Sequence, residues 1–89
     1  MPLSTHDPRE ALDRMASEVA ATIAGDFPDV ETEYDLYVEK IGPTTFGVID
    51  MGDAYMSAFE WYGGEWCPVG HDPHALVDRI VKIRTGGRS

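Results

Sequence analysis

The sequence predicts an α+β domain: a two-layer sandwich of order α-β-β-β-(β)-α, in which an antiparallel meander sheet carries both helices on one face. Three observations support this class. Apolar residues recur at helical spacing near both ends of the chain, three or four strand-like segments lie between them, and the links are short. Short links join antiparallel neighbours, and two amphipathic helices need an apolar sheet face to cover. The 89 residues suffice for one domain, 1–89, with one modest core.

Both predicted helices start with an aspartate followed by a proline. Asp7 caps a helix over about residues 8–24, and Asp72 caps one over about 73–85. An Asp side chain accepts hydrogen bonds from the free N–H groups of a first turn, and Pro suits the first helical position. The apolar stripes are Leu12, Met15, Ala16, Val19, Ala20 and Ile23 in the first helix, and Leu76, Val77, Ile80, Val81 and Ile83 in the second.

The predicted strands cover about residues 30–41, 44–50 and 54–62, and residues 65–69 have the pattern of a short fourth strand. Glycine-containing pairs separate them, and Pro68 favours an edge position for the fourth strand. These pairs are Gly42-Pro43, Gly52-Asp53 and Gly63-Gly64.

The first strand alternates between apolar and acidic residues. One parity holds Val30, Thr32, Tyr34, Leu36 and Val38, and the other holds Glu31, Glu33, Asp35 and Glu39, interrupted by Tyr37. Side chains of a strand alternate between its faces, so the carboxylates would form an exposed row about 6.5–7 Å apart. Such a row is a coarse polyanion that a basic nucleic-acid channel could accept. The alternative is a merely solvated face.

Charge is distributed unevenly along the chain, whose net charge is −9. Residues 15–78 contain thirteen acids against Lys40, whereas residues 79–89 contain four cations and no acid. A body this acidic repels nucleic acid and anionic membranes and attracts basic proteins. We therefore expect no direct nucleic-acid or membrane partner, while acid-to-base contacts leave a homodimer open. The four cations are Arg79, Lys82, Arg84 and Arg88.

The α-β-β-β-α order resembles the double-stranded-RNA-binding domain at the level of topology. Asp72, Pro73 and His74 stand where such a domain carries cations. The resemblance therefore implies no RNA-binding function.

The segment Trp61-Tyr62-Gly63-Gly64-Glu65-Trp66 places three large aromatic residues around a tight turn. Trp and Tyr dominate protein-binding hot spots, so this hairpin is a candidate apolar anchor. The alternative is that Trp66 folds back and fills the core.

No catalytic or cofactor motif is present: the sequence lacks a glycine-rich phosphate loop, a nucleophile elbow and a His-Glu-x-x-His pattern. Cys67, His71 and His74 are ligand types for zinc, but their spacing matches no zinc motif. We therefore expect no enzyme, no cofactor and no metal. A single cysteine, no signal-peptide pattern and no long apolar run indicate a cytoplasmic setting.

These observations favour a small acidic interaction protein that binds a basic protein or a nucleic-acid-binding complex. Its sharpest form is a phage- or mobile-element-type inhibitor that mimics nucleic-acid charge. One alternative is a housekeeping domain whose acidity reflects a halophilic or GC-rich source, and a less favoured one is a zinc-binding module. The candidate partner-binding residues are Glu31, Glu33, Asp35, Tyr37, Glu39, Glu60, Tyr62 and Trp66.

Overall fold

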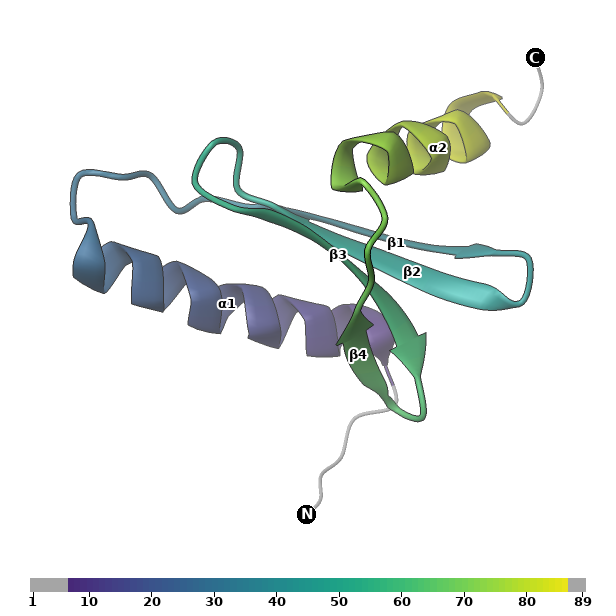
Figure 1. Ribbon diagram of the computed structural model, residues 1–89, viewed down its shortest axis with the longest axis horizontal. Helices are drawn as coiled ribbons and strands as arrows, with labels where there is room; N and C mark the ends of the chain where they lie inside the picture. The colour runs from purple at the N-terminus through teal and green to yellow at the C-terminus, as the bar shows by residue number, and fades with distance from the viewer. Residues whose placement is uncertain (1–6, 87–89) are drawn as a thin grey trace.

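The computed structural model describes residues 7–86 as two helices and a four-stranded sheet (Figure 1). In chain order the elements are α1 (Pro8–Asp26), β1 (Asp35–Ile41), β2 (Thr44–Asp50), β3 (Met56–Tyr62), β4 (Glu65–Pro68) and α2 (Pro73–Gly86). Neighbouring strands pair in the order β1-β2-β3-β4, and each pair is antiparallel. The predicted α+β class, the element order with a fourth strand, and the meander are therefore confirmed.

Both helices begin in the way that the Asp-Pro pairs predict. The Asp7 carboxylate accepts a hydrogen bond from the Arg9 N–H at 3.0 Å, and the Asp72 carboxylate accepts one from the His74 N–H at 3.0 Å. Each bond satisfies an N–H of the first turn that has no partner within the helix. The first helix runs to Asp26 rather than to residue 24.

The first strand begins at Asp35 rather than at residue 30, because its sheet partner ends there. Asp35 pairs with Asp50, which is the last residue of β2. Further along the meander, two-residue links join β1 to β2 and β3 to β4. The second link is Gly63-Gly64 with φ of 63° and 86°, values that glycine adopts without steric cost.

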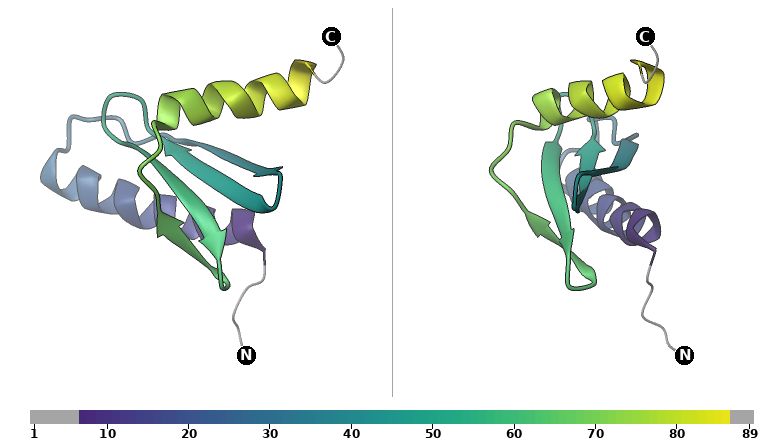
Figure 2. Two further views of the ribbon diagram at one scale, coloured as in Figure 1. Left: turned by 45° about the vertical axis from the view of Figure 1, so that its right-hand side comes forward. Right: turned by 90° about the vertical axis from the view of Figure 1, so that its right-hand side faces the viewer.

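The two helices lie on opposite faces of the sheet, so the prediction that both cover one face is wrong (Figures 1 and 2). The cross-strand partners Leu36 and Ile49 belong to the core beneath α1. The next pair, Tyr37 and Val48, belongs to the core beneath α2. Successive residues of a strand point to opposite faces. The sheet is therefore the middle layer of three.

The central strands carry apolar side chains on both faces, which is the reason for this arrangement. Val48 and Ile49 are adjacent in β2 and both are fully buried, and Ala58 and Phe59 repeat the pattern in β3. A strand that is buried on both faces has a continuous apolar run rather than an alternating one. The alternation of residues 30–41 favoured a one-sided sheet, but it describes the edge of the sheet and not its centre.

Trp66 fills the α1 side of the core. It is 8% exposed, and its indole N–H donates to the Pro8 carbonyl at 2.8 Å. Its ring meets that of Trp61 edge to face, with centroids 5.0 Å apart. Gly47 provides the space for this packing: a Cβ on Gly47 would lie 2.8 Å from Cη2 of Trp66 and 3.0 Å from Cδ2 of Leu12.

We predict that Gly47→Ala lowers the free energy of unfolding by about 1–3 kcal/mol, because the new methyl group overpacks the contact between Trp66 and α1. Urea unfolding followed by tryptophan fluorescence measures this effect. Gly70→Ala is the matched control, because a Cβ on Gly70 would meet no atom within 4 Å and its φ is not positive. Equal stabilities of the two variants would contradict the packing role of Gly47.

Candidate functional site

The segment that leads into β1 keeps its alternating burial although it lies outside the sheet. Glu31, Glu33 and Asp35 are exposed, whereas Thr32 and Tyr34 between them are half-buried. The three acids therefore face solvent as the sequence predicts. Because β2 ends at its pairing with Asp35, they project from the end of the sheet and not from its face.

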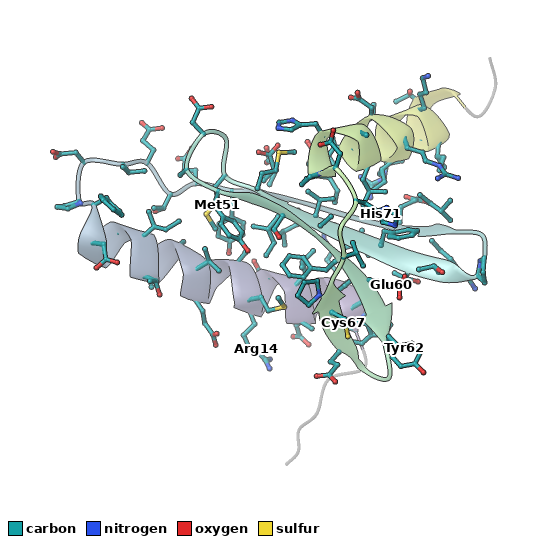
Figure 3. All side chains as sticks on the ribbon, viewed as in Figure 1. Arg14, Met51, Glu60, Tyr62, Cys67 and His71 are labelled. Carbon is teal, nitrogen blue, oxygen red and sulfur yellow. The ribbon has the colours of Figure 1, made fainter. Side chains whose placement is uncertain are left out.

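Two connections bring further acids to this end of the sheet. Three carboxylates lie in the α1–β1 connection and two at its ends, on the last residue of α1 and the first residue of β1. One more lies in the β2–β3 turn and one on the last residue of β2. Carboxylate-bearing side chains extend from both connections at the left of the view in Figure 3. We call this set the acidic end, and it consists of Asp26, Asp29, Glu31, Glu33, Asp35, Asp50 and Asp53.

The acidic end has a high density of uncompensated negative charge. Residues 26–35 and 50–55 contain no Lys, Arg or His, and no ion pair to these carboxylates is found within residues 7–86. Asp35 stands directly across the sheet from Asp50, and like charges in that position destabilise a strand pair. A cationic partner would relieve this repulsion.

Two open hollows lie side by side at the acidic end and share Asp50. Glu31, Glu33 and Asp35 line one of them together with Asp50. The other extends from Asp50 toward α2. It is lined by Asp50, Gly52, Asp53, Tyr55, Met56, His74, Val77 and Asp78. Carboxylates therefore border both hollows, which suits them to cationic groups.

Tyr34 ties the α1–β1 connection to the first helix. Its hydroxyl donates to a carboxylate oxygen of Asp13 at 2.8 Å. The pKa of the Tyr34 hydroxyl is raised above its ordinary value of 10.0, first by this hydrogen bond and then by burial and by the negative charge of Asp13. The bond restrains the connection from which Glu33 and Asp35 project.

Two of the predicted site residues lie beneath α2 and not at the acidic end. Tyr37 packs in the core between the sheet and α2. Glu39 forms an ion pair with Arg84 of α2, with Nε and Oε1 3.0 Å apart. The same guanidinium donates to the Val38 carbonyl at 2.8 Å. Glu39 is therefore already paired within the chain, and the predicted four-acid row is interrupted there.

The remaining predicted residues lie around the β3–β4 hairpin. Glu60 is half-buried, and Tyr62 is 72% exposed. Both are labelled in Figure 3. Trp66 is in the core, as the alternative interpretation of this hairpin proposed, so we leave it out of the candidate surface. β3 starts next to the acidic end at Met56 and ends at Tyr62, about 20 Å away at 3.3 Å per residue. Tyr62 and the acidic end do not form one surface.

The acidic end has apolar residues of its own, which the sequence pattern did not single out. Phe27 is 59% exposed and Val30 is 39% exposed, and both lie in the α1–β1 connection between its acids. The signal was present in Phe27-Pro28-Asp29-Val30, where Pro followed by Asp is typical of a β-turn. However, Pro28 also fits a helix stop, and Val30 also fits the first core residue of a strand. The pattern alone therefore did not distinguish an exposed β-turn from a helix end followed directly by a strand.

Cys67, His71 and His74 do not converge in the structure. The His71 ring packs edge to face against Phe46, with centroids 5.7 Å apart. Within residues 7–86, no group of three or more His, Cys, Asp or Glu side chains is arranged to hold a metal ion. Of the predicted basic end, Arg79, Lys82 and Arg84 lie on α2, and Arg88 lies outside the described residues.

Neither described helix combines the length and the apolar character that crossing a membrane requires. Comparison with known proteins finds no matching family model, no matching curated protein and no matching solved structure.

We predict that Tyr34→Phe lowers the free energy of unfolding by about 0.5 kcal/mol near neutral pH, because an exposed hydrogen bond contributes toward the low end of the usual range. The folded chain holds the Tyr34 proton more tightly than the unfolded chain does. The stabilisation is therefore complete below pH 10 and is lost as the pH rises through the raised pKa. Denaturant unfolding of both proteins from neutral to alkaline pH should show the difference disappear.

Tyr62→Phe is the control for this comparison, because Tyr62 is exposed and its hydroxyl makes no hydrogen bond within residues 7–86. It should match the wild type across the pH range. A difference between Tyr34→Phe and the wild type that is independent of pH would contradict the hydrogen bond to Asp13 as its cause.

Proposed function

We propose that this chain is a small, non-enzymatic interaction protein that binds a basic partner protein through its acidic end. The observation that carries the proposal is the gathering of seven carboxylates within and at the ends of two connections at one end of the sheet, where residues 26–35 and 50–55 contain no Lys, Arg or His. The cations of residues 7–86 lie elsewhere: Arg9 and Arg14 on α1, Lys40 at the far end of β1, and Arg79, Lys82 and Arg84 on α2.

The separation of charge supports binding by electrostatic steering. A surface of one sign attracts a partner of opposite sign over about one Debye length, which is about 10 Å at 0.1 M salt. Complementary charge mainly raises the association rate and selects the partner. The mutual repulsion of Asp35 and Asp50 adds to this, because a bound cation reduces it.

The sharper form of the proposal is a phage- or mobile-element-type inhibitor that occupies the nucleic-acid-binding site of a basic complex. Its support is that six of the seven carboxylates are exposed and stand at intervals along or beside the connections, as phosphates do on a nucleic-acid strand. The seventh, Asp50, is half-buried and accepts a hydrogen bond from the Gly52 N–H. A protein that neutralises phosphates with Lys and Arg has a surface suited to such a group.

Neutralising Glu31, Glu33 and Asp35 as Gln, Gln and Asn should weaken partner binding by about 3- to 150-fold at low salt, if each exposed charge contributes about 0.2–1 kcal/mol. We would immobilise the wild type, capture basic proteins from extract of the source cell, and identify them by mass spectrometry. Added duplex DNA should release them.

The matched control neutralises three acids outside the acidic end, Glu18, Glu60 and Glu65, as Gln. It changes the net charge equally, and it should still capture the same proteins. Equal loss of capture in both triple variants would contradict the acidic end as the binding surface. If added DNA does not displace the captured proteins, nucleic-acid mimicry is contradicted, whereas binding through the acidic end is not.

A halophilic origin predicts acids spread over all surfaces and folding that needs molar salt. Seven of the sixteen acids gather at one end, which favours binding. We therefore expect cooperative thermal unfolding at 20 mM salt, with a melting temperature close to that in molar potassium chloride. Circular dichroism melts at the two concentrations measure this. A chain that folds only in molar salt would support the environmental explanation.

A further inference from the structure

We propose that Phe27 and Val30 are the apolar anchor of the acidic end, and that the matching surface of the partner is an apolar pocket rimmed by Lys or Arg. This inference rests on the proposed function and adds the chemistry of the partner surface. The sequence predicts an apolar anchor on the Trp/Tyr hairpin, whereas the inferred anchor lies on the connection between α1 and β1.

The backbone holds these two residues in a defined turn. The Phe27 N–H donates to the Ile23 carbonyl at 2.7 Å, which fixes Phe27 as the C-cap of α1. The Val30 N–H donates to the Phe27 carbonyl at 3.0 Å and closes a turn around Pro28. An anchor that is already ordered loses less conformational entropy on binding than a flexible one.

The chain leaves the core between Ile23 and Tyr34. Both of those residues pack against the core beneath α1, whereas neither Phe27 nor Val30 belongs to either core cluster. Burying a Phe side chain contributes roughly 1.5–3 kcal/mol. Most of that contribution is unused in Phe27, which is 59% exposed, and it remains available to an interface.

The charges around the turn specify the partner. Asp26, Asp29 and Glu31 flank the two apolar side chains, and residues 26–35 contain no cation. Protein interfaces commonly place apolar contacts at the centre of a polar rim. An apolar centre with an acidic rim therefore fits an apolar pocket with a basic rim. A second acidic end is a poor occupant, because like charges would meet, and nucleic acid is repelled for the same reason.

Other exposed apolar side chains lack this combination. Val81 and Ile83 are about 40% exposed on α2, but the cations Lys82 and Arg84 stand beside them. Tyr62 is exposed at the opposite end of β3 from the acidic end. Tyr62 therefore provides a control: an exposed aromatic residue outside the acidic end, whose cross-strand partner is the single acid Glu65.

The test uses two synthetic peptides of equal charge as probes, one with three Lys-Lys-Leu repeats and one with three Lys-Lys-Ser repeats. We expect the wild type to bind the Leu peptide at least about threefold more tightly, because Leu contacts the exposed apolar pair. The double variant Phe27→Ser/Val30→Ser should bind both peptides with the affinity that the wild type has for the Ser peptide. Tyr62→Ser should keep the preference. Fluorescence anisotropy measures the affinities.

The results separate this inference from the proposed function. If the wild type binds both peptides equally, or if the double variant keeps the preference for Leu, the anchor is refuted while charge-based binding stands. If neither peptide binds, or if the Glu31, Glu33 and Asp35 variant binds as the wild type does, the proposed function fails. Backbone NMR shifts of wild-type residues 26–31 on adding the Leu peptide provide a check that needs no variant, and unchanged shifts would refute the anchor.

A second copy of the chain is the competing occupant. Sedimentation of the wild type at low salt should show a monomer if the anchor serves a basic partner. A dimer that the double variant dissociates would overturn the assignment of the partner.

Discussion

The fold depends on the burial of β2 on both of its faces. Val48 and Ile49 are adjacent, point in opposite directions and are both fully inaccessible to solvent. Each needs its own covering helix, so the sheet becomes the middle of three layers. Gly47 completes the constraint, because the absence of its Cβ lets Trp66 and Leu12 meet over the strand. The buried positions of the central strands therefore have no room for charge, and most acids of the sheet and its connections lie toward its edges and ends.

This displacement explains why the acids gather as they do. The predicted row of four carboxylates assumed a solvated sheet face, but α2 covers part of that face and Arg84 pairs with Glu39. Glu31, Glu33 and Asp35 instead project where the pairing of β1 and β2 ends. Asp50 at the end of β2 and Asp53 in the turn that follows add to them. The cross-strand pairing of Asp35 with Asp50 places like charges opposite each other, which is a local cost to stability. Proteins tolerate local costs of this kind at functional sites, which supports this end of the sheet as the place of binding.

Much of the fold is predictable from short-range chemistry. The Asp7 and Asp72 caps, the glycine turns and the alternating burial of residues 31–36 depend on neighbours in sequence. The sheet face that each helix covers is not predictable in this way. It depends on whether β2 is buried on one face or on both, and the sequence around Val48 and Ile49 fits either arrangement. Trp66 was ambiguous for a related reason: its hydrogen bond to Pro8 joins residues 58 positions apart. The exposure of Phe27 was not predicted, because exposure depends on how the folded chain packs. The neighbouring Pro28 did not help, because it fits both a helix stop and a β-turn.

The position of the anchor has a consequence for how binding would depend on salt. Had the aromatic hairpin been the anchor, charge and apolar contact would lie about 20 Å apart, and a partner would need a broad surface to use both. At the acidic end they coincide, so a small pocket suffices. Association then depends on carboxylates that salt screens, whereas dissociation depends on Phe27 and Val30, which salt does not weaken. Salt should therefore slow association far more than it speeds dissociation, which distinguishes this geometry from a purely electrostatic contact.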